Sequence, residues 1–531
     1  MKRRTFLKSA IATTAASPFL LEGMPVRATT PLKYLAQMPE ADLNDRILII
    51  VQLFGGNDGL NTIIPANDPA YYNARPNIAI PKDKCVSYGN IYFAPNLSYG
   101  DKGGLVQLLR QGSLAVVQGI GYPHSNGSHF RSTDIWLSGI NDSNPDHRLD
   151  TGWVGRYLEQ KYPNFPASLP DDPLAIQFGG FSLALLGSKG RMGIEVTKPS
   201  GQQGVGASSD ALDDESTGTS YLNEYNFVAD VATRSNKYAQ RVKDAYAAGK
   251  VKLQAKYGND GFSTQLANCA ALIAGGLKTK VYVVSTGGFD NHVTQNTGPD
   301  VGAHPGLIGN VSDAISQFMY DMVKLNIGDR VIGLTVSEFG RTVQENGSLG
   351  TDHGTASVQF VFGTQVNSGV FGNPPSLSNL NEYNNLVYNI DYHEVYLEVL
   401  TKWFDLSLKD AQLLLPDPNK YAPNLEPLPV LQTQQNSVNG SSLARKLTIT
   451  GNYPNPFGNR TSVNIELPQS GVVTLDLSSI DGKVNRRMFE RQLPSGTQQI
   501  SVDMGDLASG SYLCIVRSAG MTATKIVQCV R

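Results

Sequence analysis

The sequence predicts a layered α/β fold, with helices on both faces of a largely parallel sheet, followed by a small all-β sandwich. Continuous apolar runs such as "RILIIVQLF" (Arg46–Phe54) are typical of strands that are buried on both faces. Such runs alternate with segments of helical period over residues 43–426, as they do in α/β domains. From residue 447 onward the segments become short, alternating and β-rich, with turn signals such as Asp481-Gly482 between them, which predicts a sandwich.

The elements of the α/β part follow in chain order. Strands are predicted where apolar residues run without interruption, at residues 46–54, 114–119, 280–286, 331–336 and 358–363. Helices are predicted where apolar residues recur on one face, at residues 104–112, 128–140, 307–325 and 392–404. In the helix at 128–140, Phe130, Trp136 and Ile140 fall on roughly one face, which we expect to be buried.

The β-rich tail is divided in the same way. Strands are predicted at residues 447–457, 461–468, 471–479, 498–504, 510–518 and 522–530. Residues 427–446 are polar and form the expected linker between the two parts.

The first 28 residues carry the features of an export signal. Arg3 and Arg4 begin a basic stretch, a mild apolar segment follows, and the small residue Ala28 ends it. The stretch "RRTFLK" resembles a twin-arginine signal, which implies passage through the twin-arginine translocase in a folded state. The apolar part is too short and too rich in Ala, Ser and Thr to span a membrane, so we expect no transmembrane anchor in the mature chain.

Charge and cysteine content exclude other classes of protein. Charged residues make up 17% of the 531 residues and the net charge is −2, so we expect no nucleic-acid partner. Four cysteines are too few for a fold built on disulfides. Cys514 and Cys529 share the last segment, and the sequence leaves open whether they pair.

Polar loops follow the predicted strands and hold the candidate chemistry. They read "GGNDGLNT" (55–62), "YPHSNGSHFRS" (122–132), "GGFDNHVTQ" (287–295) and "SEFGRT" (337–342), with "GTDHGT" (350–355) before the last strand of the sheet. Because ligands of open α/β sheets bind beyond the carboxyl ends of the strands, we expect these loops to converge. The alternative is that their Asp and Asn side chains only stabilise turns.

Asp, Glu and neutral His together suit one or two divalent metal ions such as Zn²⁺ or Mn²⁺. The candidate metal ligands are Asp58, Asp290, His292, His304, Glu338 and His353. Two such ions would activate a nucleophile and neutralise charge on a phosphoryl or sulfuryl group.

Ser128 opens a predicted helix, and two roles stay open for it. It is either a helix N-cap or a nucleophile at a helix N-terminus, where free N–H groups favour an anion. In the second role His129 assists its ionisation and either Arg131 or Arg341 pairs with an oxyanion. Lesser candidates on the same helix are Ser132, Thr133 and Asp134.

Seven stretches in order resemble the domain of unknown function 1501 family. They are "FGGNDGLNTIIP", "GSHFRSTDIWLSG", "TGWVGRYL", "STGGFDNH", "SEFGRT", "GTDHGT" and "DYHEVYLEVLTKWF". That family is related to the alkaline phosphatase and sulfatase superfamily. The resemblance therefore implies an alkaline-phosphatase-like core with two metals, which hydrolyses or transfers phosphate and sulfate esters.

The resemblance also implies roles for particular residues. It makes Ser128 the nucleophile, and the matching metal ligands are Asp58, Asp290, His292 and His353, with His304 as a further ligand. Glu338 falls where the superfamily places an Asp-His pair, and the residue after it is Phe339. Because a phenyl ring cannot ligate, the second metal site lacks a histidine.

Residues 447–531 resemble the C-terminal sorting domain of the Por, or type IX, secretion system. The resemblance rests on "NYPNPF", "LSSIDGKVN", "LASGSYLCIV" and the last strand with Lys525. It implies export across the outer membrane by the type IX machinery, with the protein secreted or held at the cell surface. An accessory carbohydrate-binding sandwich is the alternative.

Two functions are compatible with these observations. The first is an exported metal-dependent hydrolase-like protein that acts on phosphate or sulfate esters, either a small anionic ester or a polysaccharide. The second is a catalytically silent binding protein of the cell surface on the same scaffold, which the missing histidine at Phe339 favours.

Overall fold

The computed structural model describes residues 19–21, 24–26, 45–180, 182–201, 237–421, 425–432, 447–453, 457–458, 460–467, 471–479, 485–494, 496–503, 508–518 and 521–530. The chain divides into two compact units, Met1–Leu431 and Gln432–Arg531. The predicted signal at 1–28 lies outside the described residues, apart from β1 (Phe19–Leu21) and β2 (Met24–Val26), which pair antiparallel. Most of the predicted linker at 427–446 lies outside them as well, so these boundaries stay predictions.

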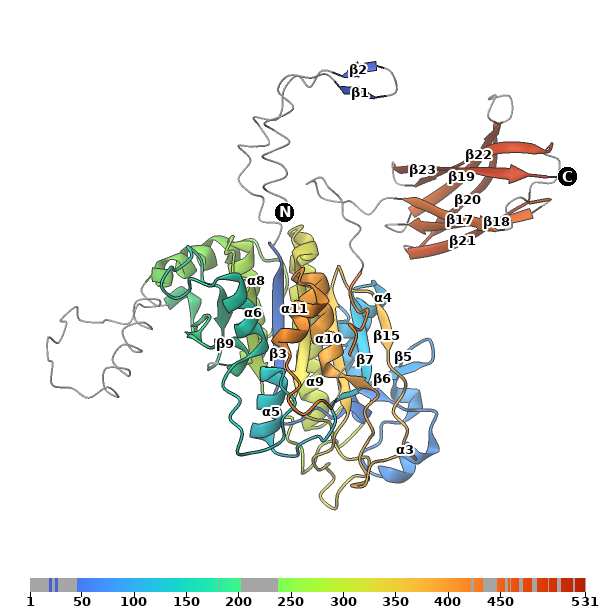
Figure 1. Ribbon diagram of the computed structural model, residues 1–531. Coiled ribbons are helices and arrows are strands. Elements are labelled where there is room, and N and C mark those ends of the chain that lie inside the picture. Colours follow the sequence, from blue (N-terminus) through green and yellow to red (C-terminus); the bar gives the residue numbers. More distant parts are fainter. Residues whose placement is uncertain are drawn as a thin grey trace. The chain divides into compact units, whose positions relative to one another are not determined.

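The first unit is built on a nine-stranded mixed sheet (Figure 1). Its order is β11 (Ile194–Glu195), β8 (Ala175–Gln177), β12 (Val281–Thr286), β3 (Ile47–Leu53), β13 (Val331–Ser337), β14 (Ser357–Gly363), β7 (Leu114–Gly121) and β15 (Gly369–Phe371), and β16 (Ile390–Asp391) also pairs with β7. Among these strands, β14 runs antiparallel to both of its neighbours and the other pairings are parallel. The prediction of a largely parallel sheet is confirmed.

β3 is buried on both faces, and this places helices on both sides of the sheet. Ile47, Ile49 and Val51 belong to one hydrophobic core, whereas Leu48 and Ile50 belong to the other. The first core includes residues of α4 (Gly104–Arg110), α8 (Gly261–Ala274) and α9 (Ala303–Lys324). The second includes residues of α5 (His129–Ser138), α6 (Trp153–Lys161), α10 (Tyr392–Glu398) and α11 (Leu408–Leu414). Helices on both faces were predicted, and this is confirmed.

Two helices differ in detail from the expectation. Phe130 was expected on the buried face of its helix, but its side chain is 87% exposed while Trp136 is buried. The helix predicted at 392–404 is not uniform, because α10 passes into a π-helix, η7 (Val399–Trp403). The strands β8, β11, β15 and β16 were not predicted, because segments of two or three residues are too short to show a period.

The second unit contains seven described strands in two antiparallel sheets. One sheet has the order β17 (Thr448–Tyr453), β18 (Arg460–Leu467) and β21 (Gly496–Asp503), and the other β20 (Asn485–Leu493), β19 (Gly471–Ser479), β22 (Gly510–Ser518) and β23 (Met521–Cys529). Val463 and Ile465 of one sheet share a core with Leu475 and Val516 of the other, so the predicted sandwich is confirmed. β20 escaped prediction because "NRRMFERQL" is mostly polar.

The question of the Cys514–Cys529 pair has a structural answer. In the β22–β23 ladder Cys514 lies opposite Lys525, and Cys529 lies opposite Gly510. The two thiols are thus four rows apart, and both are buried and free. Burial raises the pKa of the Cys514 thiol to about 12, which keeps it protonated and unreactive.

Within the described parts of the chain, none of the helices combines the length and the apolar character that a membrane-spanning segment requires.

Candidate metal centre

The sheet brings the predicted loops to one edge. β3, β7, β12 and β13 point in the same direction, so their carboxyl ends at Leu53, Gly121, Thr286 and Ser337 meet at that edge. β14 points the other way, so the residues that precede it arrive at the same place. The expected convergence of these loops is therefore present.

Asp290 is surrounded by imidazole rings. Its Oδ1 atom lies 2.9 Å from Nε2 of His292 and 3.3 Å from Nε2 of His353, and its Oδ2 atom lies 3.5 Å from Nε2 of His129. The Nε2 atoms of His292 and His353 are 3.0 Å apart. His129, Asp290 and His353 have ligand atoms within 4.8 Å of one another. These four residues, His129, Asp290, His292 and His353, are called the strand-end cluster below.

The other nitrogen of each ring determines where its proton lies. Nδ1 of each ring is 2.8 Å from an oxygen, and the three oxygens are the carbonyl of Gly127 for His353, Oδ1 of Asp352 for His292, and Oε1 of Glu338 for His129. Because carbonyl and carboxylate oxygens only accept, each Nδ1 carries the proton and donates it. In the neutral ring Nε2 then presents a lone pair. All three lone pairs face the carboxylate of Asp290.

Electron-pair donors that face one another repel unless a cation lies among them. Metal-bound histidines are held in this way, with the far N–H donated to a carboxylate or a carbonyl. Three imidazole nitrogens and one carboxylate oxygen form a set that suits Zn²⁺. An extra proton on one ring is the other way to relieve the repulsion, and metal analysis distinguishes the two. The residues present fit one metal ion.

Arg341 holds the loops of this edge together. It is 1% exposed, and its guanidinium donates 2.7 Å to Oδ1 of Asp290. Its other donors go to the backbone carbonyls of Gly55, Gly56, Phe289 and Thr351. Burial alone would raise the pKa of Asp290, but the hydrogen bond and charge of Arg341 hold it below its ordinary value. The predicted role of Arg341 as an oxyanion partner does not fit this placement, and it is instead a positioning residue.

Glu338 and Phe339 lie behind the cluster. Glu338 is 4% exposed, and its Oε1 atom accepts from the amide of Gly55 at 2.7 Å as well as from His129. The carboxylate thus orients His129, although it was predicted as a metal ligand. The ring of Phe339 is buried, with centroids 4.6 Å from the ring of His353 and 5.1 Å from that of His129. It forms an apolar wall for these two imidazoles.

Asp58 was predicted as a ligand, but the structure places it in a separate buried group. Its Oδ2 and Oδ1 atoms are 2.7 Å and 3.1 Å from the two terminal nitrogens of Arg75, which is 0% exposed. Gln295 donates to Oδ2, and the amide of Leu60 donates to Oδ1. Burial raises the pKa of Asp58, but the charges of Arg75 and His304 and hydrogen bonds outweigh it and lower the pKa. Both oxygens are engaged, so a metal ion would have to displace Arg75.

His304 was also predicted as a ligand and belongs to the same buried group. It lies in the first turn of α9, is 1% exposed, and has Nε2 3.0 Å from Oδ1 of Asn57. Burial lowers the pKa of His304 to about 4. Its Nδ1 atom is buried without a hydrogen-bond partner. Asp58, Arg75, Asn57 and His304 are called the buried salt-bridge group below.

Ser128 lies at the N-terminus of α5, next to the cluster along the chain. Its side chain is exposed, and it makes no capping hydrogen bond although it occupies the N-cap position. Gly127, on one side, accepts from His353, and His129, on the other side, belongs to the cluster. The N-cap role of Ser128 therefore lacks its hydrogen bond, and its role as a nucleophile stays a prediction.

The sequence reasoning missed two contributors. Arg75 follows the short helix α3 (Pro69–Ala74) and pairs with Asp58, which lies 17 positions earlier in the chain. The sequence around Arg75 contains no motif that would predict this pairing. The carbonyl of Gly127 is a backbone group, which sequence patterns do not reveal.

Two family models match the chain. The model described as "Protein of unknown function (DUF1501)" matches residues 196–407, which contain Asp290, His292 and His353. The model described as "Secretion system C-terminal sorting domain" matches residues 452–528. This second match indicates that the protein is secreted or carried to the cell surface by type IX secretion.

The chain is also similar to solved structures, at low identity. A protein of the alkaline phosphatase superfamily from Vibrio parahaemolyticus is 9% identical and has a TM-score of 0.30, over 84% of this chain and 82% of its own. The sulfatase PsFucS1 from Pseudoalteromonas sp. is 9% identical with a TM-score of 0.31, over 86% and 84%. A β-glucosidase from Kluyveromyces marxianus is 14% identical with a TM-score of 0.13. That similarity covers only 18% of this chain and 15% of the β-glucosidase. A search of curated proteins gives no match.

Proposed function

We propose that this chain is an exported metal-dependent hydrolase that acts on phosphate or sulfate esters. The observation that carries the proposal is the convergence of three Nε2 atoms on Asp290, with Nδ1 of each ring 2.8 Å from an oxygen atom. The side chains are also accessible to a substrate, because His129, His292 and His353 are 33%, 39% and 27% exposed.

A Zn²⁺ or Mn²⁺ ion held by the strand-end cluster would supply positive charge beside the ester oxygens. The chain itself provides the nucleophile. Oγ of Ser128 attacks phosphorus or sulfur, the bond to the alcohol oxygen breaks, and the serine proton ends on the departing alcohol. A water molecule then displaces Ser128 and releases inorganic phosphate or sulfate. The first-turn N–H groups of α5, which the side chain of Ser128 does not cap, would support the anion.

Metal analysis and an ester panel on the purified full chain test this proposal. The expected result is one bound transition-metal ion per chain and turnover of at least one aryl phosphate or aryl sulfate. His353→Ala should lose both metal and turnover, whereas Ser128→Ala should keep the metal and lose turnover.

His147→Gln is the matched control, because His147 is an exposed histidine that pairs with Asp142 and is not a member of the cluster. It should keep both metal and activity. A wild-type protein without metal, together with unchanged turnover in Ser128→Ala, would refute the proposal.

A second function is favoured by a different observation, the shortage of ligands for a second ion. Phe339 is buried where the resemblance implies a histidine, and Asp58 is engaged by Arg75. A protein with this site could bind a metal and an anionic polysaccharide without hydrolysing it. In that case the ester panel would give no turnover, and binding of a sulfated polysaccharide would be lost in His353→Ala.

The route of export is part of the proposal. The sorting-domain match concerns the outer membrane, and we propose that residues 1–28 direct the earlier twin-arginine step. The double variant Arg3→Lys/Arg4→Lys should stay in the cytoplasm. A chain that ends at residue 446 should reach the periplasm but not cross the outer membrane. Unchanged export of the double lysine variant would exclude the twin-arginine route.

A further inference from the structure

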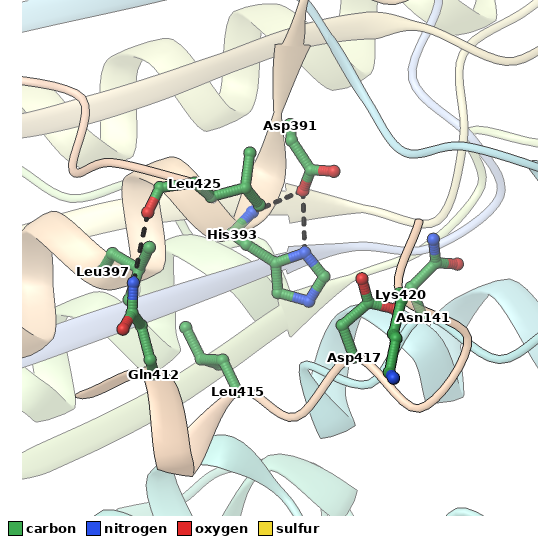
Figure 2. Close-up of a pocket in the computed structure, with 9 residues that line it drawn as sticks. All are labelled: Asn141, Asp391, His393, Leu397, Gln412, Leu415, Asp417, Lys420 and Leu425. Carbon is green, nitrogen blue, oxygen red and sulfur yellow. Dashed lines mark hydrogen bonds and ion pairs between the residues drawn. The ribbon is translucent and has the colours of Figure 1, made fainter. Parts of the chain in front are cut away.

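A pocket lies at the edge of the sheet where β16 ends, and the proposed hydrolysis does not use it. Asp391 ends β16, in register with Gly121 at the end of β7. The pocket has a volume of about 320 Å³, and Figure 2 shows its lining. The lining residues come from the segment after α5, from α10, and from α11 with the residues that follow it; they are Asn141, Asp391, His393, Leu397, Gln412, Leu415, Asp417, Lys420 and Leu425.

Two buried oxygens of this pocket have no hydrogen-bond donor. They are Oδ2 of Asp391, whose residue is 3% exposed, and Oδ1 of Asn141, whose residue is 1% exposed. The other carboxylate oxygen of Asp391 is engaged, since it accepts from the amide of His393 at 3.0 Å and lies 2.7 Å from Nδ1 of that ring (Figure 2). A buried acceptor without a donor is costly, and two of them on one pocket suit a ligand with at least two donor groups.

The charge of the pocket indicates that this ligand is neutral. Both nitrogens of His393 face oxygens, because Nε2 lies 3.2 Å from the carbonyl of Gly139 while Nδ1 faces Asp391. Each of these two contacts needs a proton to be a hydrogen bond, whereas a neutral ring beside a carboxylate supplies only one. Asp391 and His393 therefore share one additional proton, and the pair has no net charge. Asp417 and Lys420 add one charge of each sign to the wall. No excess negative charge is present to attract a cation.

The remaining surface is apolar. Leu397 and Leu415 are buried, and Leu425 is half-buried beside them. Two acceptors on one side and leucines on another suit a molecule that has hydroxyl groups along one edge and C–H groups on its face. The volume lies at the lower end of the range of about 300–1,000 Å³ that is usual for small-ligand sites.

We propose that this pocket binds a neutral polyol of the size of one monosaccharide. Its hydroxyl groups donate to Oδ2 of Asp391 and Oδ1 of Asn141, and its C–H face lies against the leucines. Lys420 is exposed at the wall and donates to a ring or hydroxyl oxygen. The site is separate from the strand-end cluster, so the inference does not depend on the proposed function.

Ligand-observed NMR and titration calorimetry on the full-length protein test this inference, with glucose, galactose, mannose and fucose as probes. At least one sugar should bind saturably. Asp391→Asn keeps the oxygen that accepts from His393 and turns Oδ2 into a donor, so it should weaken binding tenfold or more. Leu425→Trp should block the pocket without altering Asp391, which keeps the test decisive where Asp391→Asn lowers the stability of the fold.

Two controls separate this site from other parts of the molecule. Lys409→Met removes an exposed lysine of α11 that does not line the pocket, and His353→Ala removes a residue of the strand-end cluster. Both should leave sugar binding unchanged. The inference is overturned if no sugar binds saturably or if binding persists in both pocket variants. It is also overturned if the cation ethanolammonium binds and the neutral sugars do not.

Discussion

The strand-end cluster and the buried salt-bridge group each contain an aspartate from a loop at one edge of the sheet, together with at least one histidine. In the cluster, Asp290 faces three rings that offer lone pairs, and its side chain is 44% exposed. In the buried group, Asp58 faces the guanidinium of Arg75, and the two side chains are 2% and 0% exposed. The comparison shows that the partner of a carboxylate, not its position after a strand, decides between a ligand and a structural ion pair.

The two groups also differ in what their charges do. Arg75 neutralises Asp58 permanently, so the buried group is complete without a metal ion. The cluster has a cation on one side only, since Arg341 donates to Asp290 from inside while the imidazoles face it from outside. Stability should therefore depend mainly on the buried group, and metal binding mainly on the cluster.

The largest expected effect is on stability, from Arg75→Met. Removal of one partner of a buried ion pair leaves an uncompensated charge at Asp58, and such changes cost about 3–5 kcal/mol. Urea unfolding of the α/β unit, followed by tryptophan fluorescence, measures the loss. All three tryptophans of the chain lie in that unit, at Trp136, Trp153 and Trp403.

Arg330→Met is the matched control, because Arg330 pairs with Asp45 at 2.7 Å but the two side chains are 38% and 44% exposed. Exposed pairs contribute about 0–1 kcal/mol, so this variant should unfold nearly as the wild type does. Equal losses in the two variants would remove the distinction between the buried group and an ordinary surface pair.

His304 gives the buried group a pH dependence. Its pKa of about 4 lies below the ordinary 6.5, so the unfolded chain binds a proton that the folded chain excludes. The free energy of unfolding is therefore unaffected by this group above pH 6.5 and decreases as the pH falls toward 4. The decrease is roughly 3 kcal/mol, at about 1.4 kcal/mol per pH unit. His304→Gln, which can still donate to Asn57, should therefore have a flatter stability curve between these pH values. Unfolding with a chelator present in both samples isolates this group from metal release, and parallel curves would contradict the assignment.

Much of the sheet and its edge could be predicted from the sequence. The apolar run at 46–54 is a strand buried on both faces, and the loops after the strands do converge. The direction of β14 could not be predicted, because an apolar run has the same appearance in both directions. Phe130 was misplaced because helical period shows which residues share a face but not which face meets the core.

The site was harder to predict than the fold. His292 and His353 were identified because the histidines of the chain gather in the strand-end loops instead of being scattered. Asp58 and Asp290 look equivalent in the sequence, since each follows a strand and a pair of glycines. Arg75 and Arg341 distinguish them, and those contacts join residues 17 and 51 positions apart. Only the folded chain reveals which carboxylate is left for a ligand.

Glu338→Gln is expected to lower the affinity for the metal ion, which is a smaller effect than those on stability. The carboxylate is 4% exposed and holds the proton of His129 on Nδ1, and Gln keeps an acceptor there but loses the charge. Loss of such an outer partner typically weakens metal affinity about 10–100-fold. Competition with a fluorescent zinc chelator measures the change. An unaltered affinity would show that His129 is not a ligand and would reduce the proposed set to Asp290, His292 and His353.

The smallest expected effect comes from Asp352→Asn, which alters the corresponding partner of His292. Nδ1 of His292 lies 2.8 Å from Oδ1 of Asp352, and this hydrogen bond and the neighbouring Asn346 hold the pKa of Asp352 below its ordinary value. The side chain is 59% exposed, so water screens its charge, and the Asn oxygen still accepts from the ring. The same chelator competition should therefore show less than about a fivefold loss of affinity, given about 0–1 kcal/mol for an exposed pair. A loss of affinity equal to that of Glu338→Gln would contradict this expectation. The charge of the exposed Asp352 would then affect metal binding as strongly as the charge of the buried Glu338, and burial would not set the size of the effect.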